Sequence, residues 1–334
     1  MIPTRNYPRY IQRSINALML QTPALAKGVT LYFFPVGSDI TKQQAICDKF
    51  LNDPSRKASE LLSHSQGASN YRAFFPQVFF FFATYGSLQS LEPPDSDRGG
   101  YKYLEAGIWI PTVFEPKDAN VLGSHLAMFP YYMFVNTSAP LAVGRELQGW
   151  DKEWAELGIP DRAFDADEFS ISPVLIKRFS AESYGVEGLL AQFRRVGDRT
   201  DADAGLLWTE ARAALKAIKR LVFKDMDPWI PGLALSIFGI PVRGLTFTFL
   251  KQFRDVRHPH HACYQSGVEA TISIREFRGL GTLHGEYELN VTRADSHPLV
   301  DQMGLDESTF SRIHGFYAEL DFVLHTGFER WRHP

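Results

Sequence analysis

The amino-acid sequence predicts an α+β fold built on an antiparallel, barrel-like sheet. Many segments have the composition of strands, and they do not alternate regularly with helices as the units of a parallel sheet do. The clearest is an aromatic run at 77–85, between Pro76 and Gly86. A continuous apolar run of this length is typical of a strand buried on both faces, because a half-exposed strand would alternate with polar residues.

The remaining elements follow from local patterns. Capping residues at 38–41 precede an expected helix over 42–51. Helical spacing of apolar residues predicts an N-terminal helical arm at 1–27 and a helical insertion at about 187–243. A final amphipathic stretch covers 308–328. The predicted strands are 29–36, 77–85, 101–114, 126–135, 139–143, 169–180, 245–253, 267–277 and 284–291.

The composition indicates a globular intracellular protein. With 334 residues, 45% of them hydrophobic, the chain can bury a sizeable core, and its net charge of -3 gives no basic footprint for nucleic acid. Two distant cysteines, Cys47 and Cys263, favour a reducing, cytoplasmic compartment. The first 21 residues lack the apolar stretch of a secretory signal. The apolar segment 228–242 is too short and too rich in proline to insert stably into a membrane.

Two segments carry the clearest functional signal. Leu141-Ala-Val-Gly-Arg-Glu-Leu147, followed by Trp150-Asp-Lys152, resembles the Ile-Ala-x-Gly-Arg-Glu-Leu, Tyr-Pro-Lys-Lys segment of the acetoacetate decarboxylase family. Upstream, Tyr103-Leu-Glu-Ala-Gly-Ile-Trp-Ile-Pro111 resembles that family's Tyr-Thr-Glu-Ser-Gly-x-x-Ile-Pro strand. Later segments, including 316–324, are similar to the family's closing strands and last helix. The resemblance covers most of the chain, and we expect one domain over 28–330.

The resemblance implies a cone-shaped antiparallel β-barrel in which Lys152 condenses with a keto substrate to form a Schiff base. An iminium withdraws electrons from the adjacent bond far better than a carbonyl does, which explains the need for an amine. The resemblance further implies Glu105 as the residue that transfers protons, a homo-oligomer, and no cofactor. At pH 7 an ordinary lysine is neutral in only about 0.04% of molecules, so the site must lower its pKa.

The sequence departs from the family at two places. Asp151 and Glu153 stand where the family has proline and a second lysine, and they would raise the pKa of Lys152 if they lay close to it. The family's carboxylate-binding arginine aligns near Val29, with only Lys27 close by. Aldol cleavage, dehydration or cyclisation through the same enamine therefore stay open beside decarboxylation. The extra sequence favours a larger, more apolar substrate, as in secondary metabolism.

Three further residues are candidate contacts to substrate, namely Arg145, Trp150 and Trp109. Arg145 could instead lock the Gly-Arg-Glu turn or pair with Glu105, and Trp150 would help to desolvate the lysine. A non-catalytic barrel that binds an apolar ligand is the second hypothesis, and an exposed or salt-bridged Lys152 would favour it. We expect no metal site, because His258-Pro-His-His261 has no accompanying carboxylate or cysteine pattern and suits a polar loop.

Overall fold

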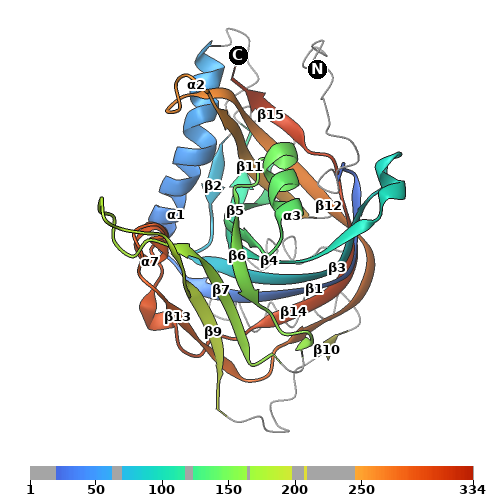
Figure 1. Cartoon of the computed structure of the whole chain (residues 1–334), viewed down its shortest axis with the longest axis vertical. Helices are drawn as coiled ribbons and strands as arrows, with labels where there is room; N and C mark the ends of the chain where they lie inside the picture. The colour runs from blue at the N-terminus through green and yellow to red at the C-terminus, as the bar shows by residue number, and fades with distance from the viewer. Residues whose placement is uncertain are drawn as a thin grey trace.

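The structure is dominated by one sheet that closes on itself (Figure 1). This computed structural model describes residues 20–61, 70–116, 123–163, 166–197, 207–208 and 245–333. They form an α+β fold in which a 15-stranded sheet is accompanied by a few short helices. The α+β class and the predominance of strands were both predicted from the sequence.

Seven strands make a ring, because β4 pairs with β3 on one side and with β5 on the other. Around the ring they are β1 (Ala24–Gly37), β3 (Gln77–Ser90), β4 (Gly100–Phe114), β5 (His125–Val135), β11 (Leu245–Arg254), β12 (Ala262–Thr282) and β14 (Phe316–Leu324). Neighbouring strands are antiparallel, except that β5 and β11 meet in parallel where Met128 pairs with Phe247. Six of these strands were predicted in place, and β14 was not.

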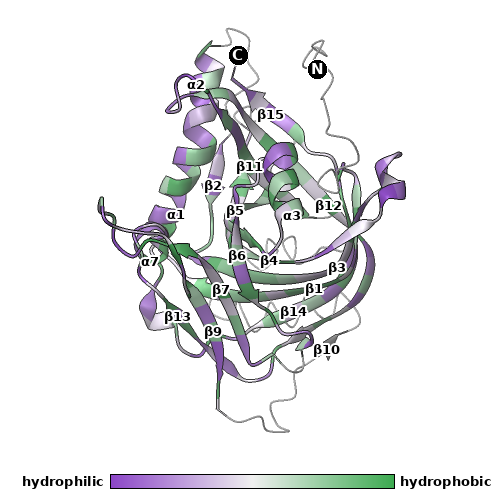
Figure 2. Cartoon of the chain, in the orientation of Figure 1, coloured by the Kyte–Doolittle hydropathy of each residue, from purple (hydrophilic) through white to green (hydrophobic). Residues whose placement is uncertain are grey.

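A second group of strands extends the sheet from β5 and packs over the outer face of β1 and β3. These strands are β6 (Lys152–Gly158), β7 (Glu168–Leu175), β9 (Ala191–Val196) and β13 (Glu286–Val291). In this outer core the ring of Phe34 stacks on Phe193 at 4.2 Å, and Phe82 lies 5.1 Å from Phe169. Hydrophobic residues are concentrated on the strands that cross the middle of the molecule (Figure 2).

Side chains of the aromatic run at 77–85 pack into two separate hydrophobic cores. Phe80 and Phe82 belong to the outer core, whereas Phe79 and Phe81 belong to the core inside the ring. Inside, the ring centroid of Phe81 lies 4.2 Å from that of Trp109. Because successive side chains of a strand point to opposite faces, this arrangement explains why residues 78–83 are all apolar. The prediction that this strand is buried on both faces is confirmed.

The helices are short and lie at the edges of the sheet. Asp39 caps α1 (Ile40–Cys47) by accepting from the Thr41 N–H at 2.7 Å, and the chain continues through η1 (Asp48–Asn52) into α2 (Asp53–Leu61). The helix expected at 42–51 is therefore confirmed and is longer than predicted. The other short elements are β2 (Tyr71–Ala73), η2 (Asp95–Arg98), α3 (Ser138–Val143), η3 (Gly144–Gln148), β8 (Val186–Glu187), β10 (Leu207–Trp208), α7 (Leu299–Met303), η6 (Glu307–Thr309) and β15 (Phe328–Arg332).

Two predictions of element type are wrong. Residues 139–143, expected to be a strand, lie in helix α3, because the chain must cross over between the parallel strands β5 and β6. Pro140 is tolerated there, since the first turn of a helix leaves its N–H groups unpaired anyway. The segment at 316–324, expected to include the last helix, is strand β14, and its burial alternates along most of its length.

Two segments that were expected to be helical also contain strands. Ala24 to Lys27, assigned to the N-terminal arm, belong to strand β1, and residues 1–19 lie outside the described part of the chain. The insertion expected at 187–243 starts at the end of β8 and contains β9, whose buried Ala191 and Phe193 alternate with more exposed residues, so helix is wrong for this part. The apolar residues on which the helical prediction depends lie outside the described residues, as does the apolar segment 228–242; they are Leu206, Ala213, Leu215, Ile218 and Leu221.

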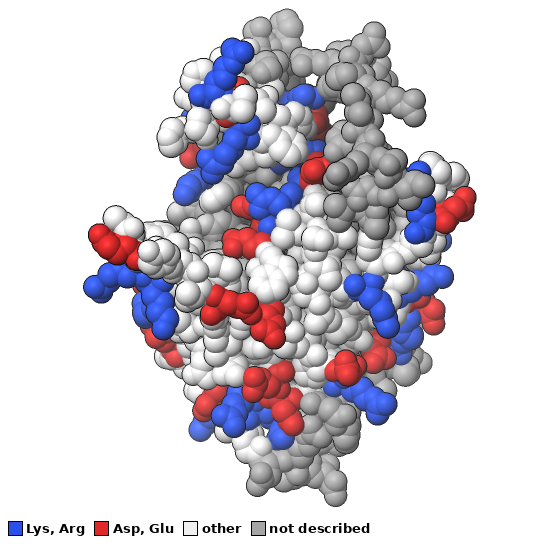
Figure 3. Space-filling model, viewed as in Figure 1, with Lys and Arg blue, Asp and Glu red and all other residues white. Residues whose placement is uncertain are grey.

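The face that Figure 3 shows has no large patch of one charge sign. Basic and acidic side chains are interspersed there, around uncharged residues. Among the described residues no helix is both long and apolar enough to cross a membrane.

Candidate active site

Lys152 and Glu105 meet inside the ring because strand β5 aligns them. Lys152 begins β6 and pairs with Met133 of β5, while Glu105 of β4 pairs with Val135 of the same strand. Residues two apart on a strand share a face, so both side chains project over the same side of β5. Lys152 Nζ donates to Glu105 Oε2 at 2.5 Å, and the two side chains are only 1% and 4% exposed.

The turn that delivers Lys152 depends on two glycines. Helix α3 runs into the π-helical turn η3, and Gly149 ends it with a φ of 85°, in the left-handed region that favours glycine. The Gly149 N–H donates to the Gly144 carbonyl at 3.0 Å. Gly144 lies directly against the lysine, since an added Cβ would be 2.9 Å from Lys152 Cδ. The lysine side chain thus passes over a backbone that has no room for another side chain.

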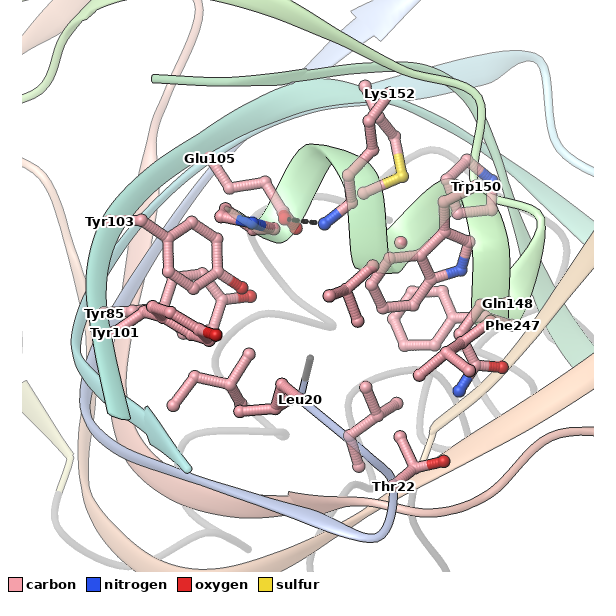
Figure 4. A pocket seen from close by; sticks show the side chains of 18 of the residues that line it. Leu20, Thr22, Tyr85, Tyr101, Tyr103, Glu105, Gln148, Trp150, Lys152 and Phe247 are labelled. Atoms are coloured by element: carbon pink, nitrogen blue, oxygen red, sulfur yellow. Dashed lines mark hydrogen bonds and ion pairs between the residues drawn. The ribbon is translucent and has the colours of Figure 1, made fainter. Parts of the chain in front are cut away.

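The Lys152 amine faces a narrow, mostly apolar cavity (Figure 4). The cavity volume is about 70 Å³. Among the described residues that line the cavity, Lys152 and Glu105 are the only charged ones. Its apolar wall includes Leu31, Leu88, Val143, Phe247, Ile272 and Phe322.

Burial lowers the pKa of Lys152 below its usual value, although the carboxylate of Glu105 acts in the opposite direction. The neighbouring acidic residues do not take part. Asp151 is 82% exposed and binds Arg145 at 2.7 Å. Glu153 points to the other face of β6, where its carboxylate lies 3.1 Å from His297 Nε2. The amine therefore meets one carboxylate inside the cavity rather than three.

Three tyrosines that were not predicted as site residues line the cavity near the carboxylate. Tyr85, Tyr101 and Tyr103 line the cavity on the side of Glu105 (Figure 4). Tyr103 lies two residues before Glu105 on β4 and therefore shares its face, a signal that alternation alone could have provided. Tyr85 comes from β3, and only the pairing of β3 with β4 brings it to this place.

The three predicted substrate contacts lie in different places. Trp150 lies under the amine, with Lys152 Nζ 4.3 Å from its ring centroid, and Trp109 lines the cavity from β4. Within the described residues neither indole N–H has a hydrogen-bond acceptor. Arg145 does not line the cavity: its Nη1 donates to the Lys152 carbonyl at 3.0 Å, and it pairs with Asp151. Its position supports locking of the turn and not pairing with Glu105, and its contact with substrate stays a prediction.

A second buried carboxylate lies away from the cavity lining. Glu269 of β12, 1% exposed, accepts from the Tyr71 hydroxyl at 2.7 Å and from Arg330 Nε at 2.8 Å, and it lies 3.1 Å from His125 Nε2. These contacts join β12 to β2, β5 and β15. The cluster therefore fastens the end of the sheet that carries the C-terminus.

The His258–His261 loop is exposed, and the described residues contain no group of three or more His, Cys, Asp or Glu side chains arranged to hold a metal ion.

Solved structures with this fold include known enzymes. The chain is similar to acetoacetate decarboxylase from Legionella pneumophila subsp. pneumophila str. Philadelphia 1, with a TM-score of 0.57 and 14% identity over 98% of this chain and 92% of that one. A second acetoacetate decarboxylase gives a TM-score of 0.51 and 13% identity, covering 94% of this chain and 92% of that one. The chain has the acetoacetate decarboxylase-like fold.

A third similar structure is the enduracididine biosynthesis enzyme MppR complexed with the condensation product of pyruvate and imidazole 4-carboxaldehyde. Its TM-score is 0.50 at 14% identity, and the match covers 94% of this chain and 92% of that one. No family model matches the sequence. No curated protein matches it either. The acetoacetate decarboxylase-like fold is thus recognised through structure, at identities that say nothing about the reaction.

Proposed function

We propose that the protein is a lyase of the acetoacetate decarboxylase type, built on that family's cone-shaped barrel, in which Lys152 forms a Schiff base with a keto compound. The observation that carries the proposal is the position of the lysine amine, which is buried in an apolar cavity and 2.5 Å from Glu105. Surface lysines stay charged and solvated, whereas a desolvated amine becomes neutral and nucleophilic at lower pH.

The cycle uses the two charged groups in turn. The ammonium proton passes to Glu105, and the neutral amine adds to the substrate carbonyl. Glu105 returns the proton as water leaves, so that its carboxylate then faces an iminium on Lys152. Cleavage of the adjacent C–C bond sends its electron pair to the iminium. Carbon dioxide departs from a carboxylate, or an aldehyde departs while ionised Glu105 takes the proton of the substrate hydroxyl group. The enamine that remains takes up a proton and is hydrolysed.

The cavity bears on the choice between reactions. Its apolar wall supports an apolar substrate. Its small volume supports a smaller substrate than the one predicted from the insertion at about 187–243. Lys152 and Glu105 balance each other, so a keto acid would bring an uncompensated carboxylate among the described residues, which is costly in an apolar site. This observation favours a second candidate, aldol-type cleavage or dehydration of an uncharged hydroxyketone through the same enamine.

Trapping of the adduct tests the proposal. The protein is incubated with a panel of keto acids, ketones and hydroxyketones, reduced with borohydride and analysed by peptide mass spectrometry. We expect a reduced adduct on Lys152, and none in Lys152→Arg. Lys251 is the matched control, because burial also lowers its pKa although it lies outside the cavity lining. Lys251→Arg should leave the adduct intact.

The same experiment also tests the alternative that the protein is a non-catalytic barrel. Lys152 is salt-bridged, as that alternative expects, but its partner is the glutamate that the catalytic hypothesis places there. Absence of any adduct on folded protein across the panel would favour a barrel that binds an apolar ligand. Full turnover by Lys152→Arg would overturn the Schiff base at this residue.

A further inference from the structure

A wide cleft lies beside the narrow cavity that holds the Lys152 amine. Its volume is about 570 Å³, against about 70 Å³ for the cavity, and Trp150 and Pro130 line both. The cleft contains the exposed ion pair between Arg145 and Asp151, together with aromatic side chains of several elements, namely Phe50, Phe129, Tyr131, Tyr132, Phe249 and Phe253. Two hollows of very different size therefore share a wall.

The indole of Trp150 forms this wall. On the cavity side, Lys152 Nζ lies 4.3 Å from the ring centroid, and an added Cβ at Gly144 would lie 3.4 Å from Trp150 Cε3. In Figure 4 the ring lies across the cavity from Glu105. On the cleft side, the ring of Phe249 packs edge-on against the indole with centroids 5.3 Å apart, and Phe249 lines the cleft but not the cavity. The indole thus contacts residues of both hollows.

Strand β11 runs past this wall from one hollow to the other. Phe247 lines the cavity and Phe249 lines the cleft, and their rings are stacked with centroids 6.3 Å apart. Residues two apart on a strand share a face, so the cavity and the cleft follow one another along the same face of β11. A substrate chain that extended from Lys152 along this face would meet the indole of Trp150.

Trp150 occupies this position through its bulk and not through a hydrogen bond. Its indole N–H is buried, and no acceptor for it is present in the part of the chain that the structure describes. A ring that donates no hydrogen bond can be replaced by a smaller apolar side chain without leaving a buried partner unpaired. The main consequence of such a replacement is therefore the space that it opens between the two hollows.

We propose that Trp150 is the specificity-determining residue of the site, which closes the cavity toward the cleft and limits the substrate to ketones with short chains. This inference rests on the Schiff base proposed above and names the substrate class for it. Short ketones and hydroxyketones stay within the closed cavity, whereas a longer chain needs the space of the cleft. A smaller residue at position 150 would join the two hollows and admit the longer chain.

Competition between a short and a long ketone measures this limit without knowledge of the natural substrate. The protein is incubated with an equimolar mixture of acetone and methyl pentyl ketone, reduced with borohydride and analysed by peptide mass spectrometry for the two adducts on Lys152. Both adducts form on the same amine, so a change in its pKa cancels in their ratio.

We expect the acetone adduct to dominate in the wild type. In Trp150→Ala the ratio of long to short adduct should rise by about tenfold, since burial of two of the additional methylene groups, at roughly fourfold each, suffices for this. Trp150→Phe keeps an aromatic ring of smaller size and should raise the ratio by less. Melting temperatures show whether the variants fold, and if Trp150→Ala does not, Trp150→Phe decides by the same ratio.

Trp154→Ala is the matched control. Trp154 lies on β6, is 44% exposed and lines neither hollow, so its replacement should change neither the ratio nor the amount of acetone adduct. An unchanged ratio in a folded Trp150 variant would overturn the length limit while the Schiff base stands, and so would a wild type that takes the long ketone as readily as acetone. A wild-type protein that forms no adduct with any ketone of the panel would overturn both proposals.

Discussion

Replacement of Gly144 by alanine, which adds one methyl group, should slow the reaction of Lys152 but change the stability of the protein little. In Gly144→Ala the new Cβ would lie 2.9 Å from Lys152 Cδ and 3.0 Å from Cε, about 0.5 Å short of the 3.4 Å at which ordinary contact begins. The backbone itself accepts alanine, because Gly144 has helical φ and ψ of −60° and −44°. Alanine gains up to about 1 kcal/mol over glycine in a helix, which offsets part of the roughly 1–3 kcal/mol of overpacking.

The lysine therefore has to move while the turn stays folded. Displacement by several tenths of an ångström takes Nζ out of its 2.5 Å contact with Glu105, and misplacement on the order of 1 Å can cost about 100-fold in rate. We expect adduct formation with a ketone to slow by about 10- to 100-fold. The free energy of unfolding should change by no more than about 2 kcal/mol.

Borohydride trapping over time and urea denaturation measure the two quantities on the same preparation. The control is Gly188→Ala, whose Cβ would meet only Leu175 Cδ1, at an ordinary 3.5 Å. An unchanged trapping rate in Gly144→Ala would refute the idea that the glycine sets the position of the lysine. A large loss of stability in parallel with activity would refute the claim that the turn tolerates alanine.

Three other outcomes follow from buried groups. Glu105→Gln removes the carboxylate that opposes the effect of burial, so the pKa of Lys152 should fall further and the pH profile of adduct formation should move to lower pH; movement to higher pH would contradict this. Glu269→Gln should lower the free energy of unfolding by about 3 kcal/mol in urea titrations at neutral pH, since it leaves Arg330 without its carboxylate. Phe34→Ala should cost about 3–5 kcal/mol in the same assay but leave trapping unchanged, because Phe34 faces the outer core.

The Glu269 cluster also sets a pH window for stability. Burial raises the pKa of Glu269, but hydrogen bonds from His125 and Arg330 outweigh this effect and leave it below the usual value. The stabilisation is therefore present above the pKa of an unfolded glutamate and is lost as pH falls through the lowered, folded pKa. For His125, burial lowers the pKa but the bond to Glu269 prevails and raises it, so its contribution is lost as pH rises. In Glu269→Gln the melting temperature should depend less on pH at both ends.

Much of the sheet could be predicted from the sequence, because alternation and aromatic runs report which faces are buried. The run at 77–85 shows this, since both sets of phenylalanines have a core to enter. The helix at 138–143 could not be predicted, because a short, mostly apolar segment fits a strand equally well, and only the parallel pairing of β5 and β6 demands a crossover. Local pattern carries no information on which strands become neighbours.

Some features of the candidate site could likewise be predicted from the sequence, and others could not. Lys152 and Glu105 could be singled out through a resemblance in sequence, and the structure brings them into contact. The effect of Asp151 and Glu153 could not be judged, because it depends on where β6 begins. Tyr85 was missed altogether, since its place beside Glu105 follows from the register of two strands and from no feature of its own segment.

For the position of Lys152, the number of residues between Gly149 and the lysine matters more than which residues they are. Side chains of β6 alternate between two faces, so deletion or insertion of one residue after Gly149 would turn the lysine out of the cavity and bring an acidic neighbour in. Such a change would exchange an amine for a second carboxylate beside Glu105. Natural variants and engineered libraries should therefore tolerate many residues at positions 151 and 153, but almost no variation in the number of residues between Gly149 and Lys152.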